Sequence, residues 1–411
     1  MKKQLKKPAG KVLEIFCDGG FGNRYNALIS GLALAEQCGL EVKVYWPKNG
    51  SCEAGYDDIF ATTLLVSEQT LPELAGTLSD AFCLLHDTLG SETLKVSFHS
   101  AYEFSSVSGF AAEVLSRYDR VFYYPALIPP WIEDDLIQSA IRALCIKDEL
   151  IQHAKGFVKG IFQRPFYGLH LRRTDLNIGL SDAEVQFLVS RHPDELFFVC
   201  SDDPIAEALA AAQPNVYRRE KKNHVGKRRQ DAGWQAPTAD DSGRVYYSNI
   251  RRGKEATLEG VIDLLVLGQS QIVSFTGSTF QSVARLIGIS GELSGFEKPP
   301  PIQIVAVGDI RRMIKSRNLT LGQLLGVCEG LVEGDRVVDA VSLLLDALEH
   351  EVGMSRFVLL FNLGVYSMKL EKNQQAMIYF RAALEIRPES EEAKDALFRV
   401  AVLQMTRTGK H

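Results

Sequence analysis

The sequence lacks long apolar runs, paired cysteines and any strong excess of charge. No stretch of its 411 residues approaches the roughly 18 apolar residues that span a bilayer, so we expect no membrane span. The apolar stretch after Lys11 is too short for the core of a signal peptide. None of the seven cysteines stands in a CxxC pair, which argues against zinc and disulfides and favours a cytoplasmic protein with reduced thiols.

A net charge of −5 gives no general reason to expect nucleic acid as a partner, so any anion has to be bound by local basic clusters. The length is too great for one ordinary core, and two or three domains are expected. We place them at residues 1–150, 151–312 and 313–411.

The first half of the chain alternates strand-like and helix-like segments. VLEIFC (12–17) predicts a strand, and the glycine turn DGGFGN (18–23) leads into an apolar helical pattern closed by Gly39. VKVYWP (42–47) predicts the next strand. This β-loop-α-β start is typical of a parallel sheet, so the predicted fold class is α/β.

A second β/α series follows, with strands in PFYGLHLR, ELFFVCSDD and SQIVSFTG. Each of these strands ends in polar residues and is followed by a helical pattern. Ligands of open α/β sheets bind beyond the carboxyl ends of the strands, so we expect these three segments to form one site. The basic segment between them, 217–247, fits a solvated loop and a lid over an anion equally well.

The last hundred residues predict an all-α region. With Phe357 as the first position of a 34-residue repeat, Gly364, Ala376 and Pro388 match a tetratricopeptide repeat. A degenerate copy precedes it. A plain helical hairpin is the alternative, and either could contact an acceptor, a partner protein or a second copy of the chain.

HLRR supplies the most informative side chains. A strand that ends in Arg172 and Arg173 presents guanidiniums, whose planar shape suits bidentate binding of phosphate. Successive strand residues point to opposite faces, so we expect one arginine in the crevice and the other paired with Asp175 or another carboxylate. A surface salt bridge is the alternative.

Two further turns could approach an anion. DGGFGN lacks the GxGxxG and GK[ST] patterns, but Asn23 and Arg24 behind it could reach a ligand across a cleft. The hydroxyls of GSTFQS (277–282) could cap a helix or bind phosphate.

Carboxylates at three places leave alternatives open. Asp263 lies in an apolar helical run and needs a partner, either the guanine of a nucleotide or a cation of the chain. Asp203 in SDDP reads first as a helix cap and second as a site residue. Asp240-Asp241 is a weak candidate, and no metal-binding cluster is apparent.

Taken in order, GGFGNR, HLRRTD, SDDP and NIRRGKEATLEGVIDLLVLGQSQIVSFTGSTFQSVAR resemble the inverting GDP-fucose transferases. The resemblance is greatest to the α-1,6-fucosyltransferases, including the nodulation type, and extends to protein O-fucosyltransferases. It implies a GT-B-like pair of Rossmann-type domains, a GDP-fucose donor, a glycan or polypeptide acceptor, and no metal or other cofactor.

The resemblance also implies residue roles. Arg172 would bind the donor β-phosphate, and His170 and Asp263 would contact the guanine or ribose. The other residues placed in the site by the resemblance or by their position in the motifs are Gly20, Gly22, Asn23, Arg24, Arg173, Asp203, Ser278 and Thr279. Since GSTF needs a small insertion to align, Ser278 and Thr279 could exchange roles with Ser282.

One departure affects the general base. The α-1,6 enzymes carry a Glu shortly after RRTD, and Leu180 stands at that place here. Asp182 is the nearest substitute, with Asp175 matched and Glu184 close by. The missing Glu favours the alternative of a degenerate fold that serves as a scaffold. A transferase of the same fold that uses another nucleotide sugar is a further alternative.

Overall fold

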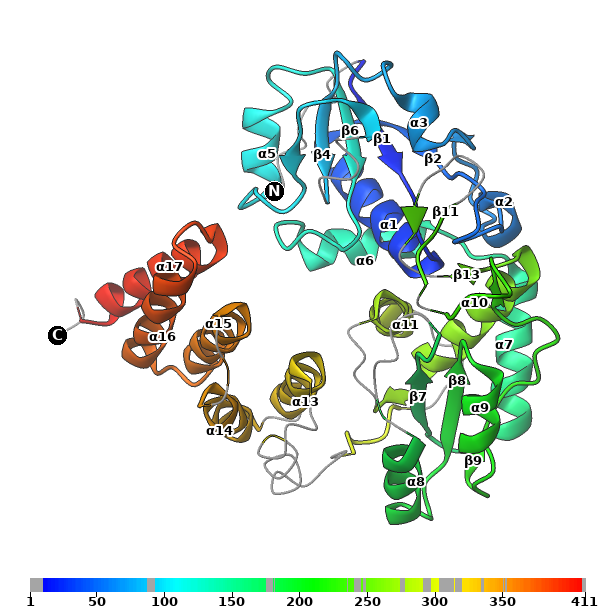
Figure 1. The fold of residues 1–411 in the computed structure, drawn as a ribbon. Helices are drawn as coiled ribbons and strands as arrows, with labels where there is room; N and C mark the ends of the chain where they lie inside the picture. The colour runs from blue at the N-terminus through cyan, green and yellow to red at the C-terminus, as the bar shows by residue number, and fades with distance from the viewer. Residues whose placement is uncertain are drawn as a thin grey trace. The chain divides into compact units, whose positions relative to one another are not determined.

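The structure, a computed structural model, describes residues 10–86, 93–174, 180, 182–234, 236–239, 245–246, 249–273, 278–290, 297–302, 314, 320–333, 336–349, 351 and 353–408. The chain forms two compact units (Figure 1). The first comprises residues up to Ile272 together with Ser278–Pro299, and the second comprises Val273–Gly277 and the chain from Pro300 onward.

The first unit begins with a six-stranded parallel sheet of order β3-β2-β1-β6-β4-β5. Its strands are β1 (Val12–Phe16), β2 (Glu41–Tyr45), β3 (Val66–Ser67), β4 (Phe82–Leu85), β5 (His99–Ser100) and β6 (Arg120–Tyr124). The connecting helices are α1 (Phe21–Cys38), α2 (Tyr56–Ile59), α3 (Leu71–Leu74) and α5 (Val107–Glu113). The predicted parallel α/β start is confirmed.

Helix α1 packs directly on the central strand β1. Its apolar residues are buried on several sides, and Gly31 allows the close approach, because a Cβ there would lie 2.5 Å from Ile15 Cδ1. The helix ends at Gly39, whose φ of 68° is the left-handed conformation expected of a closing glycine.

The same unit contains a second parallel sheet, of order β14-β7-β8-β9. Its strands are β7 (Tyr167–Leu171), β8 (Phe197–Ser201), β9 (Val216–Tyr217) and β14 (Gln271–Ile272). Around it and between the sheets lie α6 (Asp134–Ala143), α7 (Asp148–Ile161), α8 (Asp182–Arg191), α9 (Pro204–Ala210), α10 (Lys254–Gln269) and α11 (Thr279–Ser290). The three predicted strands of this series are all present.

Helices α10 and α11 cross almost backbone to backbone. A Cβ on Gly268 would lie 2.6 Å from the carbonyl oxygen of Ala284, and one on Gly288 would overlap the backbone of Gly268. This crossing fixes where α11 begins, beside the carboxyl end of β7.

The segment between β9 and α10 forms two short antiparallel ribbons. They are β10 (Gly226–Lys227) with β13 (Ile250–Arg251), and β11 (Thr238–Ala239) with β12 (Val245–Tyr246). The segment and the start of α10 contact the first half of the unit through ion pairs: Arg251 with Glu53 at 2.6 Å and Lys254 with Asp58 at 2.7 Å.

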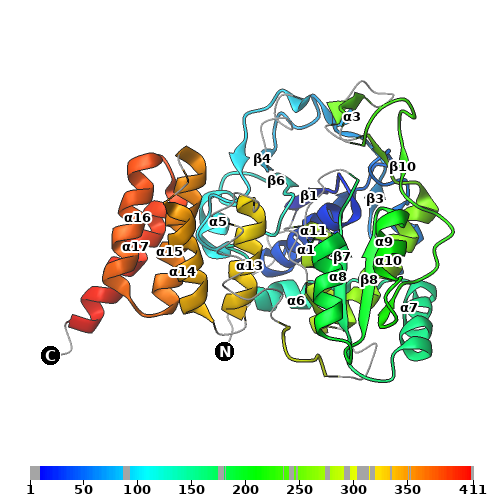
Figure 2. The ribbon, with the colours of Figure 1, turned by 60° about the horizontal axis from the view of Figure 1, so that its bottom comes forward.

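The second unit is helical, as predicted. Its helices are α13 (Leu321–Glu333), α14 (Val337–Leu348), α15 (Gly353–Lys369), α16 (Asn373–Ile386) and α17 (Glu391–Thr408), drawn in yellow to red in Figures 1 and 2. Gly364 of α15 lies against Phe380 of α16, and Pro388 follows the end of α16. The paired helices fall where the 34-residue pattern places them, and their assignment to the tetratricopeptide class remains a prediction.

The domain limits at residues 150 and 312 also remain predictions. The two sheets belong to one compact unit. Residue 150 lies within α7, which packs against α10 of the second sheet. Within the described chain, no helix has the length and apolarity that crossing a bilayer requires.

The α10–α11 crossing can be tested by adding one methyl group. We expect Gly268→Ala to lower the free energy of unfolding by about 1–3 kcal/mol, because the Ala284 backbone cannot move aside. Gly156→Ala in α7 is the control: apart from its chain neighbours and the nearby backbone of its own helix, no described heavy atom lies within 4 Å of its Cβ position, so it should stabilise by up to about 1 kcal/mol. Urea unfolding monitored by circular dichroism measures both, and equal effects would contradict the crossing.

Candidate functional site

Polar side chains gather where β7 and β8 end. The two strands pair in parallel with Leu171 opposite Ser201, so Arg172 and Arg173 leave the sheet beside Asp202 and Asp203. The Ser201 hydroxyl donates to the Leu171 carbonyl at 2.6 Å and ties the two strand ends together. The convergence expected for HLRR and SDDP is therefore present.

Arg172 points toward the start of α11. Its Nη1 donates to Ser278 Oγ at 3.4 Å, and that oxygen also accepts from the backbone N–H of Phe280 at 3.3 Å. Arg172, Ser278 and Thr279 thus lie together at a helix N-terminus, a place that favours anions. Ser282 donates to the Ser278 carbonyl at 3.4 Å from within the helix.

The glycine turn of the first sheet meets this helix N-terminus. A Cβ on Gly22 would lie 2.8 Å from the backbone nitrogen of Phe280 and from Thr279 Oγ1. The N-termini of α1 and α11 are therefore in direct contact. Gly22 is required for this approach, whereas the neighbouring Gly19 is required for its φ of +78°.

Arg24 was expected to be able to reach a ligand across a cleft, but the structure turns its side chain into the protein. Its side chain is fully buried, and its guanidinium donates to the carbonyls of Gly19 and Pro47 at 2.8 Å each and to Asn49 Oδ1 at 3.2 Å. Because its donors bind Gly19 and the loop after β2, Arg24 ties the glycine turn to that loop. Asn23 remains partly exposed beside Gly19 and keeps its place as a candidate.

His170 is buried near the end of β7 and stacks on the Phe280 ring, with centroids 4.8 Å apart and an interplanar angle of 24°. Burial lowers its pKa to about 4; the Arg172 cation acts in the same direction, and Asp202 opposes it. The imidazole is therefore neutral at pH 7.

Arg173 pairs with a carboxylate, as expected of one of the two arginines. It forms an ion pair with Asp182 at 3.2 Å and donates to the Leu180 carbonyl, and its backbone N–H donates to Asp202 Oδ1 at 2.8 Å. Its side chain is thus engaged in holding the loop after β7. Asp175 lies outside the described residues.

Asp203 caps a helix, as its position in SDDP suggested first. Its carboxylate accepts from the Ile205 N–H at 2.8 Å, at the start of α9. The adjacent Asp202 instead turns toward the loop after β7 and accepts from Thr174 Oγ1 as well as from Arg173. Of the pair, Asp202 is the residue that binds the chain directly after β7.

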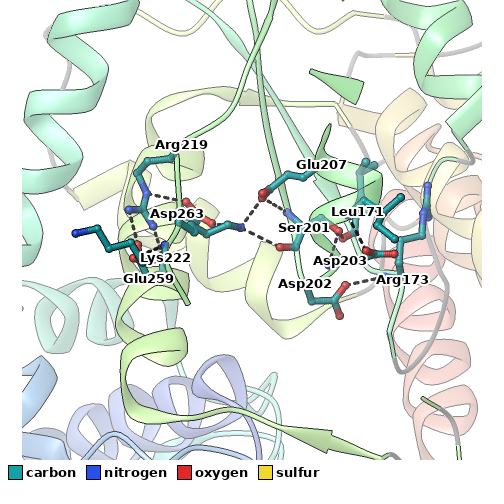
Figure 3. A network of polar contacts seen from close by, with 12 residues as sticks. Leu171, Arg173, Ser201, Asp202, Asp203, Glu207, Arg219, Lys222, Glu259 and Asp263 are labelled. Carbon is teal, nitrogen blue, oxygen red and sulfur yellow. Dashed lines mark hydrogen bonds and ion pairs between the residues drawn. The ribbon is translucent and has the colours of Figure 1, made fainter. Parts of the chain in front are cut away.

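Asp263 is almost fully buried, and cations of the chain satisfy it (Figure 3). Arg219 Nε donates to Oδ1 and Lys221 Nζ donates to Oδ2, each at 2.9 Å. Of the two partners that the sequence left open, the structure gives it the cations of the chain. A guanine is not required to compensate the buried charge.

The cations extend this arrangement into a network. Lys221 also binds Glu207 and donates to the Ser201 carbonyl at 3.0 Å, while Arg219 pairs with Glu259 of α10 at 2.5 Å. Burial lowers the pKa of Lys221, but the carboxylates of Asp263 and Glu207 outweigh it and the net shift is upward. The network joins β8, α9 and α10 beside the site.

Arg219 and Lys221 were missed because the segment 217–247 showed only a mixture of charges. The buried Asp263 gave the available signal, because a carboxylate in an apolar helix needs donors, but the sequence does not say which cations supply them. Among the described residues, no group of three or more His, Cys, Asp or Glu is placed to hold a metal ion.

Comparisons with known proteins give remote structural similarity alone. No family model matches the chain, and no curated protein matches it in sequence. The chain is similar to a NodZ alpha-1,6-fucosyltransferase co-crystallized with GDP, with 15% identity, a TM-score of 0.44, and 67% of this chain and 92% of that chain covered.

Two further solved structures are similar to a comparable degree. The fucosyltransferase NodZ from Bradyrhizobium has 13% identity and a TM-score of 0.45, covering 68% of this chain and 93% of its own. POFUT1 in complex with GDP has 12% identity and a TM-score of 0.38, covering 70% and 97%. At these values the function has to be inferred from the chain's own residues.

The buried network predicts a large effect of removing one cation. We expect Lys221→Met to lower the free energy of unfolding by about 3–5 kcal/mol, because Glu207 and Asp263 lose a shared partner inside the protein. Lys222→Met removes the exposed neighbour and should change it by less than about 0.5 kcal/mol. Chemical unfolding measures both variants, and a mild effect at position 221 would contradict the network.

His170 predicts a pH-dependent contribution to stability. Its pKa is about 4 when folded and near 6.5 when unfolded, so between these values the unfolded chain binds more protons. The contribution of His170 to the free energy of unfolding is therefore fully present above pH 6.5. It falls on acidification, by about 2 kcal/mol between pH 7 and pH 5. Comparing urea unfolding of the parent and His170→Gln at both pH values isolates this contribution. Identical pH dependences would contradict it.

Proposed function

We propose that the chain is an inverting glycosyltransferase that moves fucose from GDP-fucose to a hydroxyl of a glycan or polypeptide acceptor without a metal ion. The observation that carries the proposal is the placement of Arg172 beside Ser278, at the N-terminus of α11 and the carboxyl edge of the second sheet. The ordered resemblance of the motifs to the GDP-fucose transferases supports the choice of donor.

The chemistry explains why such a site uses guanidinium. The acceptor oxygen attacks the anomeric carbon, the bond to the diphosphate breaks, and the diphosphate leaves with the bonding electrons. Negative charge grows on the leaving group, and fixed cations and N–H donors stabilise it. Arg172 and the N–H groups at the start of α11 would perform this task.

His170 and Phe280 would bind the nucleoside side of the donor. A neutral imidazole can accept or donate a hydrogen bond without adding charge, and its stacking on Phe280 holds the ring in one orientation. Asn23 and the glycine turn of the first sheet would line the donor from the opposite side.

The acceptor proton requires a carboxylate or another base. Asp182 remains the candidate: it stands at the start of α8, and its side chain is half-exposed. Its ion pair with Arg173 at 3.2 Å would have to loosen, or be shared with the acceptor, for Asp182 to take the proton. The glycan or polypeptide acceptor could be held in part by the helical unit.

We place the protein in the cytoplasm and propose a GT-B-like pair of domains, with the helical unit as a tetratricopeptide-like surface for an acceptor, a partner or self-association. A different donor is the second candidate, and the pairing of Asp263 with Arg219 and Lys221 favours it. Calorimetric titration with GDP and UDP separates the two, because preference for UDP would reject GDP-fucose.

The proposal is tested by donor turnover. With labelled GDP-fucose and a panel of glycans and polypeptides, we expect Arg172→Ala to reduce both transfer and donor hydrolysis by about 10²–10³-fold. Arg164→Ala changes an exposed arginine ahead of β7 and serves as the matched control. EDTA should leave the rate unchanged. Unaltered turnover by Arg172→Ala would reject the proposed role of this site.

A further inference from the structure

A second arginine, Arg252, contacts the glycine turn of the first sheet. Arg252 lies between β13 and α10, and its backbone is fixed by two hydrogen bonds to the loop after β2. Its N–H donates to the Gly50 carbonyl at 2.9 Å, and its carbonyl accepts from the Glu53 N–H at 3.0 Å. The second half of the unit thus presents this side chain to the first sheet at a defined position.

The guanidinium of Arg252 covers Gly20. A Cβ on Gly20 would lie 3.9 Å from Arg252 Cζ and Nη1, and no other described heavy atom comes within 4 Å beyond the adjoining residues. Gly20 has φ −71° and ψ 167°, which any residue adopts, so neither strain nor crowding explains the glycine. The glycine leaves room between the turn and the guanidinium.

The neighbouring glycine connects this place to Arg172. Gly22 touches the start of α11 at Thr279. The preceding residue is Ser278, whose hydroxyl oxygen accepts a hydrogen bond from Arg172. Both guanidiniums therefore contact the junction between the N-termini of α1 and α11, Arg252 at Gly20 and Arg172 at Ser278. Neither helix carries an acidic residue in its first turn, so no carboxylate of those turns competes for the positive end.

We infer that Arg252 is a donor-binding residue that holds the diphosphate of the nucleotide sugar together with Arg172. This inference rests on the proposed function and adds a ligand contact from the other side of the glycine turn. Two guanidiniums can engage phosphate oxygens from two directions, and both stabilise the charge that the diphosphate gains as the bond to the sugar breaks. Arg252 is partly exposed, which leaves it accessible to a ligand.

The adjacent arginine offers a matched control. Arg251 is the last residue of β13, and its largely exposed side chain pairs with Glu53 at 2.6 Å. Arg251→Ala removes the same charge from the next position in the chain. It changes an ion pair that lies between two surface side chains and leaves the glycine turn untouched.

The experiment measures binding of GDP, GMP and inorganic pyrophosphate to the full chain by calorimetry. We expect Arg252→Ala to weaken the binding of GDP and of pyrophosphate by about 10-fold or more, because a charge-assisted contact to the second phosphate is lost. The effect on GMP binding should be much smaller. Arg252→Lys should recover part of the affinity, and Arg251→Ala should bind all three as the parent does. Melting temperatures of the variants check that folding is retained.

The outcomes separate this inference from the proposed function. Equal loss of GDP and GMP in Arg252→Ala, or no loss of either, overturns the role of Arg252 while leaving the donor site intact. Binding of pyrophosphate but not GDP by the parent, with pyrophosphate lost in Arg252→Ala, rejects the guanosine donor and retains the diphosphate contact. A parent that binds neither ligand overturns both.

Discussion

The contact between Gly22 and the start of α11 is the constraint on which the candidate site depends. It brings the positive ends of two helices from different sheets within van der Waals distance, and a methyl group at Gly22 would already collide with the backbone of Phe280. Such a junction is electrostatically unfavourable by itself. An anion bound there would relieve it, and this is the role proposed for the diphosphate held by Arg172 and Arg252.

The buried charges away from the junction follow a different logic. Asp263, Glu207, Arg219 and Lys221 satisfy one another inside the protein, and together they fix β8 relative to α9 and α10. Desolvation makes each of these charges costly alone, so the group holds together as a whole. Within the segment after β9, this pairing holds Arg219 and Lys221 in place, and the choice between a solvated loop and a lid remains a prediction.

The sequence was sufficient for the features that depend on local pattern. The spacing of apolar residues, the glycine turns and the polar strand ends predicted the two parallel α/β series and the helical C-terminal region. They also predicted the closing Gly39 and the cap at Asp203. Each of these features depends on residues that are neighbours in the sequence. The pairings of Arg24, Arg173 and Asp263 depend on residues brought together by the tertiary fold. The burial of Arg24 could not be predicted for that reason: a charged residue beside a glycine turn gives no sign of whether the chain folds over it.

The segment from Arg218 to Gly253 belongs to both halves of the first unit. Its beginning supplies two cations to the second sheet, and its end is hydrogen-bonded to the loop at residues 50–53 of the first. Cutting the chain between the two sheets would therefore leave each half without contacts that the other half supplies. A fragment carrying only the first sheet would expose the backbone groups of that loop. The two sheets should therefore be expressed and engineered as one piece.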